Sequence, residues 1–152
     1  MAGGKGGWTP VSSGSGSGVT EGAAVRRAAT TTAASGSTIT ITFDTADTNT
    51  DSMWSAGDPT KLTAQTAGWY VITGHVYWNN SGTGFRQVAL AINGAARHTQ
   101  GCRSESTSYF VPQEVSLVTY LGVGDYITMT ILASGGASSL LGDARLSMVL
   151  IG

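Results

Sequence analysis

Residues 68–78 read Gly-Trp-Tyr-Val-Ile-Thr-Gly-His-Val-Tyr-Trp, and this stretch decides the fold. Its density of aromatic and β-branched residues suits a pleated strand and not a helix. Because side chains alternate along a strand, the stretch predicts two apolar rows. The rows are Tyr70, Ile72, Val76 and Trp78 on one side and Trp69, Val71, His75 and Tyr77 on the other. A two-layer β-sandwich covers only one row, so we expect an identical subunit to cover the second.

The composition indicates one domain of short strands and tight turns. The chain has 152 residues, of which 41% are hydrophobic and 22 are glycine, enough for one core. Charged residues make up 11% and the net charge is −1, so neither nucleic acid nor an anionic membrane is an expected partner. The single cysteine, Cys102, has no partner for a disulfide or at metal-ligand spacing. We therefore expect no cofactor and no redox chemistry.

Residues 1–22 form a Gly/Ser-rich N-terminal arm ahead of a predicted head domain, residues 23–152. Such a composition is typical of a flexible linker. Its Gly-x-Gly spacing is not a phosphate loop, because no strand precedes it and no Lys-Ser or Lys-Thr follows. Trp8 and Val11 are among its few substantial apolar side chains. If the arm anchors the protein to a partner, these two residues are the candidate anchors.

The start of the chain lacks a secretory signal, since no apolar core follows Lys5. No later run of about 18 apolar residues could span a membrane. We therefore expect a soluble protein that is made in a cytoplasm. Residues 79–81 match the glycosylation triplet, but without a secretory route they are predicted to be a turn.

Most of the head predicts short strands separated by turns. Residues 23–34 predict an edge-like strand of weak register, and residues 38–43 predict a half-buried strand. Asn93-Gly94 is a strong hairpin signal. Further strands are expected at 60–66, 87–92, 95–100, 115–121, 127–131 and 145–151, with loops at 101–108 and 134–139. The last strand is apolar on both faces and is expected beside the central one. The pattern predicts an antiparallel β-sandwich.

Residues 44–59 contain four carboxylates, those of Asp44, Asp47, Asp51 and Asp58. Four carboxylates in one loop are able to bind calcium, yet their spacing fits no ordered calcium loop. Each Asp also has a turn-forming role. We predict no metal site, and the calcium alternative stays open at this stage.

Three motifs then occur in a recognisable order, and a C-terminal apolar strand follows them. The motifs are Gly68-Trp69-Tyr70-Val71, then Ile92-Asn93-Gly94, and then the run from Leu121 to Ile127, which contains Gly124-Asp125. Over roughly residues 39–152 the chain resembles the jelly roll of the complement globular head and the tumour necrosis factor ligands. The resemblance implies a compact homotrimer whose inner sheets pack around a threefold axis. The residues predicted to approach that axis are Val71, His75, Tyr77, Val118, Tyr120, Met148 and Leu150.

The middle of the chain, residues 43–62 and 84–86, looks most like small bacteriophage-encoded versions of this domain on virion surfaces. No collagen Gly-x-y repeat precedes the head, so the head itself must hold the trimer. The glycines Gly122 and Gly124 and the side chain of Asp125 are predicted to shape a turn.

The two histidines, His75 and His98, lie in no catalytic motif, so we predict no enzyme. The resemblance implies a virion structural protein, a capsid-decoration or head-fibre type docked by its arm on a capsid or tail scaffold. The alternative is a receptor-binding head of a tail fibre or tail tip, with distal loops 79–84 or 103–110 meeting a host glycan or protein. Either protein is expected on the virion surface after synthesis in the host cytoplasm.

Overall fold

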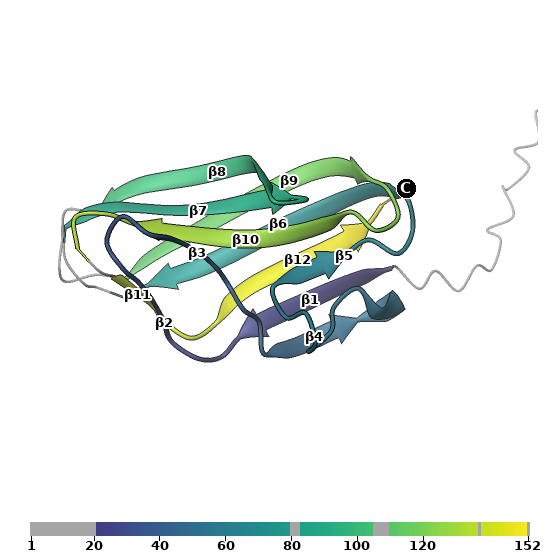
Figure 1. The fold of residues 1–152 in the computed structure, drawn as a ribbon, viewed down its shortest axis with the longest axis horizontal. Coiled ribbons are helices and arrows are strands. Elements are labelled where there is room, and N and C mark those ends of the chain that lie inside the picture. Colours follow the sequence, from purple (N-terminus) through teal and green to yellow (C-terminus); the bar gives the residue numbers. More distant parts are fainter. Residues whose placement is uncertain (1–20, 80–82, 105–109, 137, 152) are drawn as a thin grey trace, which may run out of the picture.

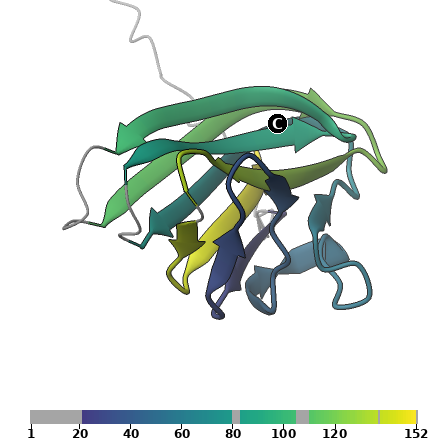
Figure 2. The ribbon, with the colours of Figure 1, turned by 60° about the vertical axis from the view of Figure 1, so that its left-hand side comes forward.

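A computed structural model describes residues 21–79, 83–104, 110–136 and 138–151 (Figure 1). They form two β-sheets of antiparallel strand pairs, and Figure 2 shows these as two layers. The predicted antiparallel β-sandwich is confirmed. None of the described segments is a helix with the length and apolar content needed to cross a bilayer.

The larger sheet is built around the strand β6 (Gly68–Trp78). β9 pairs with β6 along its whole length and β12 pairs with the other edge of β6, as predicted for the last strand. Beyond β12 follow β1 and then β4, while β11 and β2 continue from the end of β6. The bounds are β1 Gly22–Arg27, β2 Thr31–Ala33, β4 Thr45–Asn49, β9 Val111–Leu121, β11 Ser138–Leu140 and β12 Ala144–Leu150.

The smaller sheet has the order β3-β10-β7-β8, with β5 also paired to β10. Its strands are β3 Thr38–Thr40, β5 Lys61–Thr63, β7 Gly84–Ile92, β8 Ala95–Ser104 and β10 Tyr126–Ala133. A short 3-10 turn, η1 (Thr50–Ser52), lies between β4 and β5. The alternation predicted for residues 38–43 is confirmed, because Ile41 and Phe43 are buried while the threonines are exposed.

The core lies between the sheets and is lined by the even-numbered row of β6. Tyr70, Ile72, Val76 and Trp78 are each at most 1% exposed. Gly74 completes this row, and a Cβ atom there would lie 2.6 Å from the sulfur of Met129 on β10. The glycine therefore makes room for a large side chain from the opposite sheet.

A buried polar cluster closes one end of the core. The indole Nε1–H of Trp78 donates to Oε1 of Gln113 at 2.5 Å. The amide nitrogen of Gln113 donates to the carbonyl of Arg86, whose guanidinium donates to the carbonyls of Phe85 and Ser134. Burial lowers the pKa of Arg86. The cluster satisfies polar groups that would otherwise be costly to bury.

The two predicted turns are joined through side chains. Asn93 and Gly94 both have positive φ, 50° and 80°, which is the geometry of a tight hairpin. Asn93 Nδ2 donates to Asp125 Oδ1 at 2.8 Å, and the amide of Gly122 donates to Asp125 Oδ2 at 2.7 Å. The hydrogen bonds from Asn93 and Gly122 hold the pKa of Asp125 below its usual value. Asp125 therefore holds two turns together.

Three local predictions were wrong. The first strand is not an edge, because β1 pairs with β12 on one side and with β4 on the other. Residues 45–49, expected in a loop, form the short strand β4, and residues 138–139 of the expected loop 134–139 belong to the short strand β11. β8 continues to Ser104, through part of the expected loop. In the last two cases pairing with a neighbouring strand decides the conformation of a polar segment.

Candidate interaction surface

The odd-numbered residues of β6 point away from the smaller sheet, because the even-numbered ones face the core. Their register partners on β9 and β12 point the same way. Val71, for example, lies between Val118 on β9 and Val149 on β12. Together these side chains form the outward face of the larger sheet.

One half of the outward face is apolar. Its members, called the apolar half below, are Trp69, Val71, Val118, Tyr120, Val149 and Ile151. Trp69 is 52% exposed, Tyr120 is 56% exposed and Ile151 is 58% exposed. The backbone amide of Ile151 bonds the carbonyl of Trp69 at 2.8 Å, which holds the end of the chain beside β6. Contiguous exposed apolar side chains of this kind mark interaction sites.

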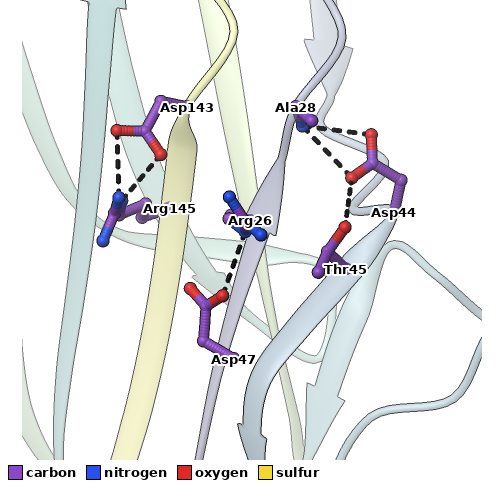
Figure 3. A network of polar contacts seen from close by, with 7 residues as sticks. All are labelled: Arg26, Ala28, Asp44, Thr45, Asp47, Asp143 and Arg145. Carbon is purple, nitrogen blue, oxygen red and sulfur yellow. Dashed lines mark hydrogen bonds and ion pairs between the residues drawn. The ribbon is translucent and has the colours of Figure 1, made fainter.

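The other half of the outward face is charged, and its two arginines pair with carboxylates of the same chain. His75 lies between Glu114 on β9 and Arg145 on β12. Arg145 forms two hydrogen bonds with Asp143, and Arg26 lies 3.0 Å from Asp47 (Figure 3).

The hydrogen bond from Arg145 to the Asp143 carboxylate raises the pKa of the Arg145 guanidinium. A depression of about 240 Å³ lies among these residues, and Thr73 and Ser147 also line it. The hydroxyls of Thr73 and Ser147 bond each other at 2.5 Å. The two arginines of the charged half are therefore neutralised within the chain, whereas the Glu114 carboxylate forms no ion pair with another described residue.

Five of the seven predicted axis residues lie on the outward face: Val71, His75, Tyr77, Val118 and Tyr120. Met148 and Leu150 do not. Met148 is fully buried opposite Ile72, and Leu150 packs against the core opposite Tyr70. Their places on the outward face of β12 belong to Val149 and Ile151. The register of β12 with β6 explains this, since directly paired residues of two strands point to the same side of the sheet.

Several predicted contact residues lie outside the described part of the chain. Trp8 and Val11 belong to residues 1–20, and the candidate distal loops include residues 80–82 and 105–109. Their roles stay predictions.

Three of the four carboxylates of residues 44–59 take separate partners. Asp44 accepts hydrogen bonds from the amide of Ala28 and the hydroxyl of Thr45 (Figure 3), and Asp47 pairs with Arg26. Asp58 Oδ2 lies 2.6 Å from the Lys61 ammonium. Within the described residues no three His, Cys, Asp or Glu side chains gather as metal ligands would.

The two histidines lie on different sheets. The ring of His75 meets the ring of Tyr77 edge-on, with centroids 4.4 Å apart. His98 is exposed on β8, which also carries Cys102. Burial raises the pKa of the Cys102 thiol, which is the opposite of what an activated nucleophile needs.

The sequence matches no protein-family profile and no curated protein. Solved structures with a similar fold include the globular domain of the zebrafish complement 1qA protein, at TM-score 0.59 and 14% identity over 87% of this chain and 98% of that chain. Eiger TNF from S. frugiperda aligns at TM-score 0.63 and 11% identity, over 88% of this chain and 93% of that chain. Murine APRIL aligns at TM-score 0.67 and 14% identity, over 86% of this chain and 98% of that chain. The chain therefore has the jelly-roll fold of these proteins.

Proposed function

We propose that this chain is the head of a non-enzymatic homotrimer that associates through the outward face of its larger sheet. The observation that carries the proposal is the apolar half, in which Trp69, Val118 and Tyr120 are each more than half exposed. Because each side chain is only about half exposed, covering the part that remains in water would contribute roughly half of the 1.5–3 kcal/mol that full burial of a large apolar side chain is worth. Association with identical chains is the simplest way to recover that free energy.

The charged half supports the same proposal. Unpaired charges buried at an interface would cost several kcal/mol. Arg26 and Arg145 already have carboxylate partners in their own chain, so a neighbouring chain is not required to neutralise them. A threefold arrangement is supported by the sequence resemblance to the complement and tumour necrosis factor jelly rolls, which implies a trimer.

We further propose that the trimer is a bacteriophage virion surface protein of the capsid-decoration or head-fibre type, docked through the N-terminal arm on a capsid or tail scaffold. The support is the sequence resemblance of residues 43–62 and 84–86 to small phage-encoded heads. The composition of the arm fits this role, since Trp8 and Val11 are apolar side chains in a segment made mostly of glycine and serine.

Removal of the arm tests this docking role. The truncation removes residues 1–20 and keeps Glu21, because the carbonyl of Glu21 accepts a hydrogen bond from the amide of Leu150 and β1 begins at Gly22. The truncated head is expected to fold and to trimerise, but not to join particles that lack the native protein. Trp8→Ala in the full chain is expected to weaken incorporation, whereas Thr38→Ala in the head is not. If the truncated head still decorates particles, the docking surface is on the head.

The second candidate function is a receptor-binding head of a tail fibre or tail tip. The observation that favours it is a hydroxyl-lined pocket on the outer face of the smaller sheet, away from the proposed interface. A receptor-binding head needs such a surface free after assembly. Loss of host attachment with normal particle assembly, on substitution of that pocket, would favour this candidate over decoration.

A further inference from the structure

The outer face of the smaller sheet is hollowed where β5, β7 and β10 meet. The hollow, called the hydroxyl pocket below, has a volume of about 430 Å³, within the roughly 300–1,000 Å³ of small-molecule sites. The register explains its shape. Ala91 on β7 lies beside Thr128 on β10, which in turn lies beside Lys61 on β5. The alanine is too short to fill the space beside the longer lysine, so a depression remains.

Threonine hydroxyls line much of the hydroxyl pocket. Those of Thr40, Thr128 and Thr130 form no hydrogen bond with any other described residue. Each hydroxyl offers one donor and two acceptor positions. They lie on paired strands, with Thr40 directly opposite Thr130. Hydrogen-bonding capacity is therefore fixed on a rigid sheet, as a preorganised polar site requires.

One ion pair forms the charged wall of the hydroxyl pocket. Lys61 Nζ lies 2.6 Å from Asp58 Oδ2, and the hydroxyl of Thr60 donates to Asp58 Oδ1 at 3.3 Å. The hydrogen bond from Lys61 lowers the pKa of Asp58, which keeps the carboxylate ionised near neutral pH. The two charges already pair with each other, so a charged ligand would have to compete with this ion pair for either group. A neutral ligand with several hydroxyls avoids that competition and can bond both groups.

An aromatic ring completes the hydroxyl pocket. Tyr126 lies at its rim, and the Lys61 ammonium lies 4.9 Å from the centroid of the Tyr126 ring. The backbone amide of Tyr126 donates to the side chain of Asn93, which fixes the residue beside the hairpin turn. The ammonium occupies one face of the ring, so the ring offers a sugar only its remaining apolar surface. Hydroxyl groups, one carboxylate, one ammonium and one aromatic ring together match the edge and the face of a pyranose.

We propose that the hydroxyl pocket binds a neutral hexopyranose ring, either as a free sugar or as the end residue of a glycan. The pocket lies within one chain and on the sheet opposite the outward face. Binding therefore does not depend on the proposed trimer, and its failure would leave the trimer proposal untouched.

The test uses the full chain and four probes: D-glucose, D-galactose, D-mannose and N-acetyl-D-glucosamine. Saturation-transfer NMR detects contact, and calorimetric titration gives the dissociation constant. At least one probe is expected to bind with a Kd of about 1 mM. Thr128→Val removes a hydroxyl at nearly constant shape, and Asp58→Asn removes the carboxylate charge. Each is expected to weaken binding roughly tenfold.

Thr38→Val is the matched control, because Thr38 is exposed on β3 of the same sheet and does not line the pocket. It is expected to bind as the unaltered protein does. Methyl glycosides of the four sugars distinguish the source. Equal binding of a methyl glycoside shows that the anomeric oxygen can carry a glycan, and binding of the free sugar alone excludes a glycan end. The proposal is overturned if no probe binds at about 50 mM, far above the expected Kd, or if Thr128→Val and Asp58→Asn both bind as the unaltered protein does.

Discussion

Trp69 on β6 and Tyr120 on β9 stand directly opposite each other, with ring centroids 6.0 Å apart and ring planes at 80°. Edge-to-face pairs of this kind are worth about 0.5–1.5 kcal/mol beyond their buried area. The pair is nevertheless more than half exposed, at 52% and 56%. Two large side chains are thus held in place on a surface, which lowers the entropy lost when that surface meets another chain.

Tyr120→Asp is expected to convert the trimer into a folded monomer. The substitution brings a charge from each chain into an interface without water or a partner, at a cost of about 3 kcal/mol or more per site. That cost raises the dissociation constant at least roughly a hundredfold. Size-exclusion chromatography with light scattering gives the mass, and circular dichroism reports whether the strands persist.

The control for Tyr120→Asp is Thr38→Asp, which places the same charge on the exposed outer face of the smaller sheet. It is expected to leave the mass unchanged. If Tyr120→Asp keeps the mass of the unaltered protein, the outward face around Trp69 is not the interface.

Asp125→Asn is expected to lower the melting temperature by a few degrees, because the carboxylate accepts bonds from Asn93 and Gly122 in two different turns. The folded-state pKa of Asp125 lies below its ordinary value of 3.8. Its stabilising contribution is therefore present above pH 4 or so and is lost as the pH falls through the folded-state value. Thermal melts from pH 7 to pH 2.5 are expected to show the two proteins converging in acid. A constant difference across that range would contradict the assigned role of the charge.

Gly74→Ala is expected to destabilise the head by about 1–3 kcal/mol through overpacking. The added methyl group would lie 2.6 Å from the sulfur of Met129 and 3.1 Å from a methyl group of Val115. Gly57→Ala is the control, since its added methyl group meets only the Ser55 hydroxyl at 3.9 Å. Chemical denaturation measures the free energy of unfolding of both variants. If the two variants are equally stable, the core around Gly74 accommodates the added methyl group without overpacking.

Gln113→Leu is expected to cost about 1–3 kcal/mol, because it leaves the buried indole N–H of Trp78 without its acceptor. Gln113→Glu keeps an acceptor oxygen at the same position and is expected to be less harmful at a pH where the carboxyl is protonated. Urea denaturation of both variants at acid and neutral pH checks this. Equal loss in both variants at acid pH would indicate that the Gln113 amide nitrogen, and not its oxygen, is the important group.

The strand β6 and its two faces could be predicted because its side chains alternate without interruption over 11 residues. The inward row and the outward row were both identified from residues 68–78 alone. For β12, where apolar residues occupy both faces, alternation separates Met148 and Leu150 from Val149 and Ile151 but does not say which pair faces the core. That choice is made by the register with β6, which aligns Met148 with the buried Ile72.

The short strands β4 and β11 could not be predicted, because their sequences TADTN and SSL have no apolar alternation. They form because β1 and β2 offer them backbone partners. The hydroxyl pocket was missed for a related reason. Thr40, Lys61, Ala91 and Thr128 are far apart in the sequence, and only the pairing of β3, β5 and β7 with β10 brings them together.

Sedimentation equilibrium of the full chain at micromolar concentration tests the central proposal most directly. A homotrimer has three times the 15.5 kDa mass of one chain, and we expect this mass to persist across a tenfold dilution. A stable monomer at the same concentrations would contradict the proposal and would leave Trp69 and Tyr120 exposed for some other partner.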